Sequence, residues 1–565
     1  MPEPLVEKMA QKADVFENEK SLGEHVAAAD DGNFVTEAPW GEEGEEPREE
    51  ELATLCHIGD KIPYSAWLVA VVELAERFTF YGLTGPFQNY MQNRRDDPRL
   101  PGALGLGQSA ATGLQYFFLF WCYITPLLGA IVADAWLGRY NAIVLFALIY
   151  ICGLLVLFVT SLPASLDSGA GLGGLIGCMI IMGLGTGGIK SNVSPLIAEQ
   201  YTRTKPVLKL LPSGERVIID PNVTIQSLYN IFYWCINIGS LSSIATVWLE
   251  LKFDFWAAYL LPFCFFFVGL FTLIVGRKSY VVRPPSGSVL LDAGKALGIA
   301  ARNGFRMDAA IPRFGEQFIN ELKRALIACR VFCFYPIYWL LYGQMNSNFI
   351  SMAGTMETHG LPNDLLFNLN PISIIVFIPS ENPHSSPITR IAFGFFLAAS
   401  SMAYAAGIQR WIYNTGPCFD FPLSCPASKD GTLPNKLHVA AQTPAYVLIG
   451  LSEIFASITG LEYAFTKAPP SMKSVVMGIF LMQNAFGYAI GIAISPTSKN
   501  PNLVTFYACL AGVTALAGAA FWFCFRHHNA SEEELNKMDA NNEEFRPRPA
   551  TDVETAVGRL KNRRH

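Results

Sequence analysis

Residues 255–276 read FWAAYLLPFCFFFVGLFTLIVG, and the charged pair Arg277 and Lys278 follows directly. A helix needs about 20 mainly apolar residues to cross the hydrocarbon core of a bilayer, and this run is long enough. Working outward from it, we predict twelve such stretches, at residues 64–91, 108–134, 140–162, 171–199, 223–249, 255–276, 327–357, 362–380, 387–411, 438–467, 472–497 and 502–526. The sequence therefore predicts an all-α membrane protein with 12 transmembrane helices.

The composition of the whole chain agrees with this prediction. Of its 565 residues, 51% are hydrophobic and only 16% are charged, against roughly 25% charged in a typical soluble domain. No basic region favours nucleic acid as a partner, and no nucleophile–base pair, phosphate-binding loop or metal-ligand cluster indicates an enzyme, a metal or a cofactor. We expect a lipid bilayer to surround most of the chain.

The charged residues concentrate at the chain ends and in a few loops. Residues 1–62 form a hydrophilic segment with acidic runs such as EEGEE at 42–46, which is typical of a disordered tail. Lys and Arg favour the cytosolic side of a membrane protein, and they gather in the loops after the fourth and sixth predicted helices. One loop is an exception, because this topology places Arg94, Arg95 and Arg99 outside the cell. The distribution of the other Lys and Arg residues still favours a cytosolic location for the 1–62 tail and the 527–565 tail.

The long loop at 277–326 divides the predicted helices into six and six. We expect an N-terminal bundle at 63–276, a cytosolic linker at 277–326 and a C-terminal bundle at 327–526. Two six-helix bundles joined in this way describe the major facilitator fold, whose solute site lies between the bundles near the membrane midplane. Residues 292–302 and 318–330 have the mixed spacing of amphipathic helices on the membrane surface, although a loose spacer also fits the sequence.

The first predicted helix contains VVELAERFTFYG at 71–82, which places Glu73, Glu76 and Arg77 inside an apolar span. Ionisable groups inside a membrane helix cost roughly 2.5–3.5 kcal/mol each on insertion scales, so they usually face a cavity or a partner. Glu73 and Arg77 lie one turn apart on a common face, with Glu76 beside them. Two acids and one base leave a surplus carboxylate that can bind and release a proton. We interpret the three residues as a proton-coupling site; a structural ion triad that joins helices is the alternative.

Two further charges lie inside predicted helices. Lys190 stands in the Gly-rich sequence GTGGIKSNVSPL at 185–196, and Glu453 lies early in the tenth predicted helix. The N-terminal half thus offers the cations Arg77 and Lys190, whereas the C-terminal half offers an anion. A solute with a carboxylate at one end and an ammonium at the other, such as an amino acid or a short peptide, would bridge the halves. A lysine that extends to the membrane interface is the alternative for Lys190.

Polar and aromatic side chains of other predicted helices could line the same cavity. A buried Asn in a membrane needs a partner or a solute, and Asn237 and Asn370 stand in such positions. Tyr81, Tyr123 and Trp339 combine an apolar body with a polar tip. Ordinary helix packing explains each of these residues as well as solute contact does.

Several motifs together resemble one transporter family. ELAERFTFYG at 73–82 resembles the ExxERFxYY signature of the proton-coupled oligopeptide transporter family, and ADAWLGRY, the Lys190 segment, FYWCINIGS, NLNP and GLSEIF follow in that family's order. The resemblance covers about residues 60–526 and is nearest to the fungal branch. It implies import of di- and tripeptides driven by protons, with no cofactor. It also implies the following roles: Arg77 and Lys190 hold the peptide carboxylate, Glu453, Asn237 and Asn370 hold the amino terminus, Tyr81 and Tyr123 line the pocket, and Glu73 and Glu76 couple protons.

The chain departs from the family pattern at four positions. Phe80 replaces the first tyrosine of the signature, and Tyr116 stands where mammalian members carry a proton-linked histidine. Some bacterial members pair an arginine with an acid where this chain has Thr84 and Gly343. We therefore expect coupling to rest on carboxylates and the gate between these helices to be built differently.

The predicted extracellular loop at 412–437 holds Cys418 and Cys425. On the oxidising side of a membrane they could form a disulfide, and two free thiols are the alternative. Taken together, the sequence predicts a monomeric proton–peptide symporter of the plasma membrane with both termini in the cytosol. The alternatives are a transporter of nitrate or another small solute, and a peptide-sensing receptor without net flux.

Overall fold

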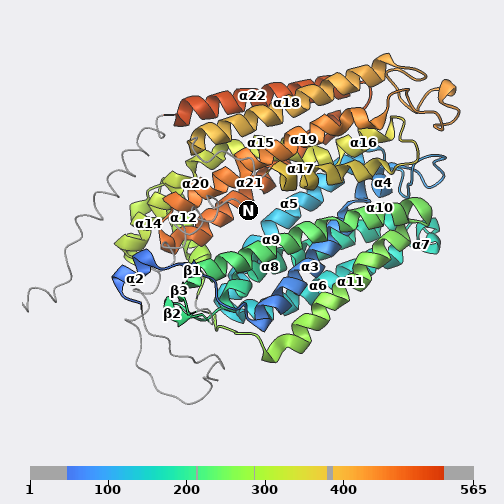
Figure 1. Ribbon diagram of the computed structural model, residues 1–565. Helices are drawn as coiled ribbons and strands as arrows, with labels where there is room; N and C mark the ends of the chain where they lie inside the picture. The colour runs from blue at the N-terminus through green and yellow to red at the C-terminus, as the bar shows by residue number, and fades with distance from the viewer. Residues whose placement is uncertain (1–46, 212–213, 286, 378–385, 527–565) are drawn as a thin grey trace, which may run out of the picture.

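The structure, a computed structural model, describes residues 47–211, 214–285, 287–377 and 386–526 (Figure 1). Long helices dominate these residues and lie roughly side by side. They are α3 (Tyr64–Thr84) with α4 (Phe87–Gln92), α5 (Gln108–Val132), α6 (Arg139–Thr160), α8 (Gly171–Glu199), α9 (Pro221–Ser240) with α10 (Ser242–Lys252), α11 (Phe255–Val275), α15 (Tyr335–Tyr342) with α16 (Asn348–Gly354), α17 (Leu369–Phe377), α18 (Pro387–Asn414), α19 (Thr443–Ser452) with α20 (Thr459–Lys467), α21 (Lys473–Ile494) and α22 (Leu503–Phe525).

Within the described residues, ten helical runs are long and apolar enough to cross a membrane. Helices α3 and α17 fit the two remaining predicted spans. Large apolar side chains cover the outside of the bundle, where Leu516 is 72% exposed and Phe271 is 69% exposed. Apolar side chains so exposed on many helices indicate contact with lipid rather than water. The protein is a multi-pass membrane protein.

Each half of the chain has its own apolar core. One core draws on residues 66–280 and the other on residues 293–521. A third, small cluster of Tyr116, Leu119 and Tyr488 joins the halves where α5 packs along α21. The two cores agree with the predicted six-plus-six division.

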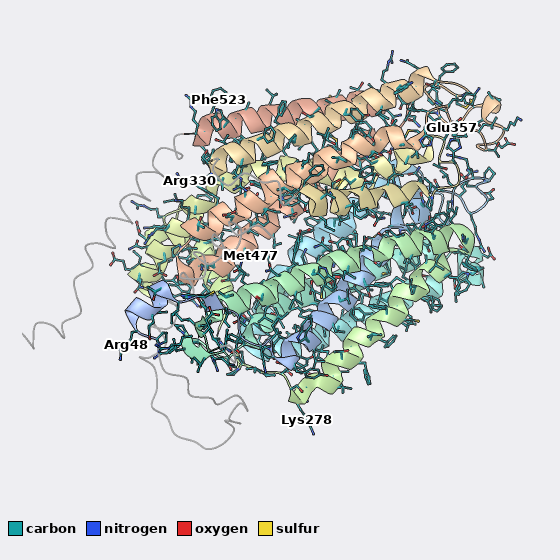
Figure 2. The ribbon with its side chains drawn as sticks, viewed as in Figure 1. Arg48, Lys278, Arg330, Glu357, Met477 and Phe523 are labelled. Carbon is teal, nitrogen blue, oxygen red and sulfur yellow. A yellow bond between two sulfur atoms is a disulfide. The ribbon has the colours of Figure 1, made fainter. Side chains whose placement is uncertain are left out.

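The bundle has two distinct ends, which we name by what they carry. The disulfide end holds the loop between α18 and α19, and the linker end holds α12 (Val289–Arg302), α14 (Glu316–Ala328) and a small sheet. In Figure 2, Glu357 lies at the disulfide end, whereas Arg48 and Lys278 lie at the linker end.

The small sheet lies at the linker end. Its strands are β1 (His57–Ile58), β2 (Val207–Leu210) and β3 (Arg216–Ile219), in the order β1-β3-β2, with β1 parallel and β2 antiparallel to β3. Just before β1 lies the short helix α2 (Glu49–Thr54). The prediction of a disordered tail over 1–62 is therefore wrong for residues 47–62, because backbone pairing with β3 orders them. Residues 1–46 of that predicted tail lie outside the described residues.

The described part of the linker contains α12, the short α13 (Ile311–Phe314) and α14. Helix α12 covers the residues 292–302 that were predicted to be helical, and their place on the membrane surface stays a prediction. Helix α14 does not stand apart, because it continues through η5 (Cys329–Phe334) into α15. The predicted linker boundary at residue 326 therefore falls inside one helical run, Glu316–Gly354. The predicted 527–565 tail and the predicted end of the eighth span at 378–380 lie outside the described residues.

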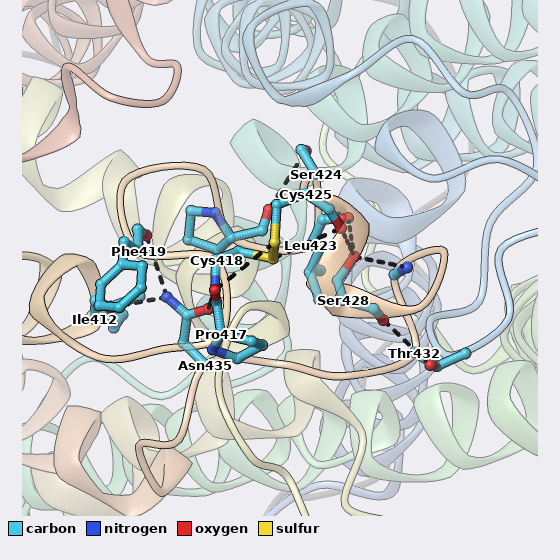
Figure 3. The surroundings of a disulfide bond; sticks show 12 residues. Ile412, Pro417, Cys418, Phe419, Leu423, Ser424, Cys425, Ser428, Thr432 and Asn435 are labelled. Atoms are coloured by element: carbon cyan, nitrogen blue, oxygen red, sulfur yellow. Dashed lines mark hydrogen bonds between the residues drawn. A yellow bond between two sulfur atoms is a disulfide. The ribbon is translucent and has the colours of Figure 1, made fainter.

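The loop at the disulfide end is tied down by covalent and polar contacts (Figure 3). Cys418 and Cys425 form a disulfide, so the structure has the first of the two states that the sequence allowed. The Asn435 amide donates to the carbonyls of Ile412 at 2.8 Å and Phe419 at 3.2 Å. The loop is thereby fixed to the end of α18.

Candidate functional site

The charged residues of α3 form one buried cluster. Arg77 Nε lies 2.7 Å from Glu73 Oε1 and 3.1 Å from Glu76 Oε2. Both carboxylates are 1% exposed and Arg77 is 7% exposed. Gly239 of α9 lets a second helix approach, because a Cβ there would lie 2.6 Å from Arg77 Cβ. One cation thus holds two acids in a dry environment, where unpaired charge is costly.

Lys190 reaches this cluster from α8. The glycines before it allow close packing: a Cβ on Gly188 would lie 2.0 Å from the Phe146 ring, and one on Gly187 would lie 2.1 Å from Thr125 Oγ1. The Lys190 Nζ atom sits 4.1 Å from the centroid of the Tyr123 ring, a cation–π contact. Glu76 and Glu73 attract Lys190. Lys190 therefore belongs to the charge cluster rather than to the membrane interface.

Glu453 occupies the facing bundle. It begins η11 (Glu453–Ile458), a π-helical segment between α19 and α20, and such segments often re-aim a side chain at a functional site. Glu453 faces Tyr342 and Asn370. Glu453 Oε2 and Asn370 Nδ2 are buried atoms that make no well-formed hydrogen bond among the described residues, although the two side chains lie within reach of each other. An acceptor and a donor are thus left available on the C-terminal bundle.

Tyrosines connect the two charged walls. Tyr81 and Tyr123 of the N-terminal bundle each interact electrostatically with both Arg77 and Glu453. The ring centroids of Tyr123 and Tyr488 lie 5.7 Å apart, across the bundle interface. The N-terminal cations and the C-terminal anion therefore face one tyrosine-lined region between the bundles.

Two predicted site residues, Asn237 and Trp339, also make contacts outside this region. Two tyrosines of the region were not predicted from the sequence. Asn237 Nδ2 donates to Tyr233 O of its own helix at 2.8 Å, so one of its two amide hydrogens is occupied. Trp339 is 5% exposed, and its ring packs against Tyr338 and Tyr342. The sequence reasoning missed Tyr342 and Tyr488; periodicity alone does not separate such tyrosines from ordinary packing residues.

The structure shows what Tyr116, Gly343 and Thr84 contact at the positions where the sequence departs from the family pattern. Tyr116 donates to Leu340 O at 3.1 Å and accepts from Gln344 Nε2 at 2.5 Å, so it links the bundles. Its ring rests on two glycines of the other bundle, because a Cβ on Gly343 would lie 2.4 Å from it and one on Gly491 2.8 Å. Thr84 Oγ1 donates to Phe80 O of its own helix.

The bundles are joined by hydrogen bonds at the disulfide end. Gln88 Nε2 donates to Ser351 Oγ at 3.1 Å, and Ser243 Oγ donates to Asn368 Oδ1 at 2.6 Å. Gln108 Nε2 donates to Asn348 Oδ1 at 2.9 Å. The disulfide end is therefore closed in this structure.

Comparison with known proteins gives a consistent result. A model of the POT family matches residues 140–314 and 306–510. Peptide transporter PTR_A of Candidozyma auris is 53% identical over 531 residues, which cover 91% of this chain and 90% of that protein. Peptide transporter PTR2 of Saccharomyces cerevisiae is 46% identical over 560 residues, 96% of this chain and 92% of that protein.

Solved structures show the same fold. The POT family transporter PepTSo superposes with a TM-score of 0.67 at 21% identity, covering 83% of this chain and 99% of that one. The fold is therefore that of the major facilitator transporters, as predicted. With a matching family model over most of the membrane region and relatives about half identical along almost the whole length, the chain belongs to the POT family.

Proposed function

We propose that this protein is a proton-coupled symporter that imports di- and tripeptides by alternating access. One observation carries the proposal: two cations on the N-terminal bundle, the buried Arg77 and the half-buried Lys190, face the same tyrosine-lined region as the half-buried Glu453 of the C-terminal bundle. A peptide carries the complementary charges at its two ends. The names of the fungal relatives, peptide transporters over nearly their full length, support the same reading.

The peptide carboxylate would bind Arg77 and Lys190. Both cations are engaged in this structure, Arg77 with two carboxylates and Lys190 with the Tyr123 ring. A guanidinium suits a carboxylate because its fork of donors matches the two oxygens. At the other end, the ammonium would meet Glu453, with Asn370 and Tyr342 beside it. The polar atoms left without partners on this wall would then be satisfied.

The proton would bind to Glu73 or Glu76. With both acids ionised they compete with the peptide carboxylate for Arg77. A proton on one acid frees part of the guanidinium for the peptide, so proton binding and peptide binding support each other. Loss of the proton on the cytosolic side lets the acid pair again with Arg77 and displaces the peptide. Each charge is compensated at each step, which the dry site requires.

The topology follows from the charge distribution. We place the linker end in the cytosol, because the basic loops lie there, and the disulfide end outside, where oxidation is favoured. A plasma-membrane location fits uptake from the medium. We propose the monomer as the transporting unit, because one chain supplies both walls of the site.

The decisive experiment is dialanine uptake by proteoliposomes, with an imposed inward proton gradient and without one. We expect accumulation only with the gradient, and we expect Glu76→Gln or Glu73→Gln to abolish gradient-driven accumulation. Full accumulation by both variants would overturn the coupling scheme. Binding of peptide without accumulation by the unchanged protein would identify a receptor. Accumulation of labelled nitrate that dialanine does not inhibit, with no accumulation of dialanine, would identify an anion carrier.

A further inference from the structure

Four buried polar side chains meet where the bundles join at the disulfide end. Asn89 of α4 and Glu250 of α10 come from the N-terminal bundle, and Asn363 and Asp364 come from η7 (Asn363–Asn368) of the C-terminal bundle. Each is at most 4% exposed. We call these four residues the latch, because they are held together only while this end is closed. None of them belongs to the peptide site described above.

The latch has too few hydrogen-bond donors. Asn89 Nδ2 lies 2.8 Å from Glu250 Oε1, 2.9 Å from Asn363 Oδ1 and 3.3 Å from Asp364 Oδ2, but an amide has two hydrogens to donate. Asn363 Nδ2 donates to Asn89 Oδ1 and to Ile350 O instead. Glu250 Oε2 and Asp364 Oδ1 have no donor among the described residues. Two buried carboxylate oxygens therefore lack a partner.

The latch also lacks positive charge. Among the described residues that interact with Glu250 or Asp364, none is a lysine or arginine; the titratable groups that face them are each other, Tyr259 and Tyr446. Lys252, the nearest cation along the chain, stacks on the Trp248 ring at 5.4 Å. Two ionised carboxylates without a cation in a dry site would repel each other strongly.

One proton solves both problems. The carboxyl groups of Glu250 and Asp364 are within hydrogen-bonding reach of each other. A carboxylate can only accept, but a protonated carboxyl group also donates. A proton on either residue therefore gives the unpartnered oxygens a hydrogen bond and reduces two negative charges to one. The neighbouring contacts, Gln88 with Ser351 and Ser243 with Asn368, are uncharged and need no proton.

We propose that Glu250 and Asp364 share one proton whenever the disulfide end is closed, so that closure of this end requires a proton from the same side. Opening separates the two residues, because they belong to different bundles, and both ionise in water. The proton then returns to the side from which it came. It adds nothing to the proton–peptide stoichiometry, unlike the proton at Glu73 and Glu76, but it makes closure sensitive to external pH. This inference rests on the topology of the proposed function.

The test measures closure directly and uses no peptide. Ser351→Cys places a thiol at a bundle contact that is 5% exposed when the end is closed. Proteoliposomes are treated from the disulfide side with a membrane-impermeant maleimide at pH 8 and pH 5. The rate is divided by that of Asp96→Cys, an exposed position at the same end, which removes the intrinsic pH dependence of thiol reactivity. The protein with Ser351 and Asp96 unchanged measures the background rate of labelling at its native cysteines.

We expect the normalised labelling rate to fall about tenfold or more from pH 8 to pH 5, because an equilibrium linked to one proton shifts by up to about tenfold per pH unit. With Glu250→Gln or Asp364→Asn added, the amide supplies the missing donor, and labelling should be slow at both pH values. The matched control, Asp96→Asn in the Ser351→Cys protein, should keep the full pH dependence. Undiminished pH dependence in both latch variants would overturn the proposal, as would equal labelling of the unmodified latch at both pH values.

A transport measurement separates the latch from the coupling site. The latch variants should keep gradient-driven dialanine uptake with unchanged proton–peptide stoichiometry, while losing the dependence of the uptake rate on external pH at constant gradient. A changed stoichiometry would contradict the return of the latch proton to its own side. Failure of dialanine uptake in the unmodified protein would instead refute the proposed function, and the labelling result would stand independently.

Discussion

In the proposed function, Glu453 is the residue that recognises the peptide amino terminus. Among the described residues, its Oε2 atom and the Asn370 amide nitrogen are buried without a well-formed hydrogen bond, and a donor and acceptor so placed are costly when left unsatisfied. An ammonium fits this position because it supplies three donors and the compensating charge. In the proposed function, the peptide ammonium binds at this position.

Glu453→Gln tests this role. The substitution keeps the shape and removes the charge, and a hydrogen bond to a charged group contributes roughly 1.5–3 kcal/mol, so we expect the KM for dialanine to rise about tenfold or more. N-acetyl-dialanine has no ammonium and should lose little affinity. Both constants come from competition with labelled dialanine. An equal loss for both peptides would show that Glu453 acts on the fold rather than on the amino terminus.

At the scale of single elements, α8 carries Lys190 to the charge cluster through its glycines. Gly188 packs against the Phe146 ring and leaves no space for a side chain. Gly177, on the same helix, has only one ordinary neighbour, Val156 Cγ1 at 3.7 Å from the position of an added Cβ. The two glycines lie on the same helix, but Gly188 is tightly packed and Gly177 has room for a methyl group.

We expect Gly188→Ala to destabilise the protein by about 1–3 kcal/mol, because the added methyl group overpacks the contact with α6. Gly177→Ala should be neutral or slightly stabilising, since alanine favours the helix. Thermal unfolding of the purified protein in detergent measures both. The packing argument fails if the two variants shift Tm equally.

The β1 segment depends on His57. Its Nδ1 atom lies 2.8 Å from Asp220 Oδ2, and its Nε2 atom lies 2.9 Å from Leu52 O. Partial burial lowers the pKa of His57, but the hydrogen bonds to Leu52 and Asp220 outweigh it and hold the pKa above its usual value. Asp220 also caps α9 through Asn222 N, so the segment is fastened to the start of a membrane helix.

A raised histidine pKa means that the folded segment favours the protonated ring. Its stabilising contribution is full below the usual pKa of about 6.5 and is lost as the pH rises through the higher folded value. We expect amide hydrogen exchange in β1 to be more protected at pH 6 than at pH 8, after correction for intrinsic exchange. His57→Gln should remove that difference. Persistence of the difference in the variant would assign it to another group.

At the scale of the whole molecule, the sequence and the structure agree where one physical rule dominates. Apolar length located the spans, and charge inside apolar spans located Glu73, Glu76, Arg77, Lys190 and Glu453. The order of residues 47–62 was not predictable, because it comes from pairing with β3, some 160 residues away. The latch was missed for a similar reason. Glu250 and Asp364 stand at the ends of apolar stretches, where acids are ordinary, and only folding buries them together.

The contact of Tyr116 with Gly343 and Gly491 has a mechanical consequence. If one bundle rotates on the other about this contact, Tyr116 is the pivot. The parts of α5 and its π-helical extension on either side of Tyr116 then differ in length. Eight residues precede Tyr116 in α5 and twenty-one follow it up to Leu137, roughly 12 Å and 32 Å at 1.5 Å per residue. A displacement at the disulfide end would then be about two and a half times larger at the linker end, so a small movement outside would accompany a much larger one inside.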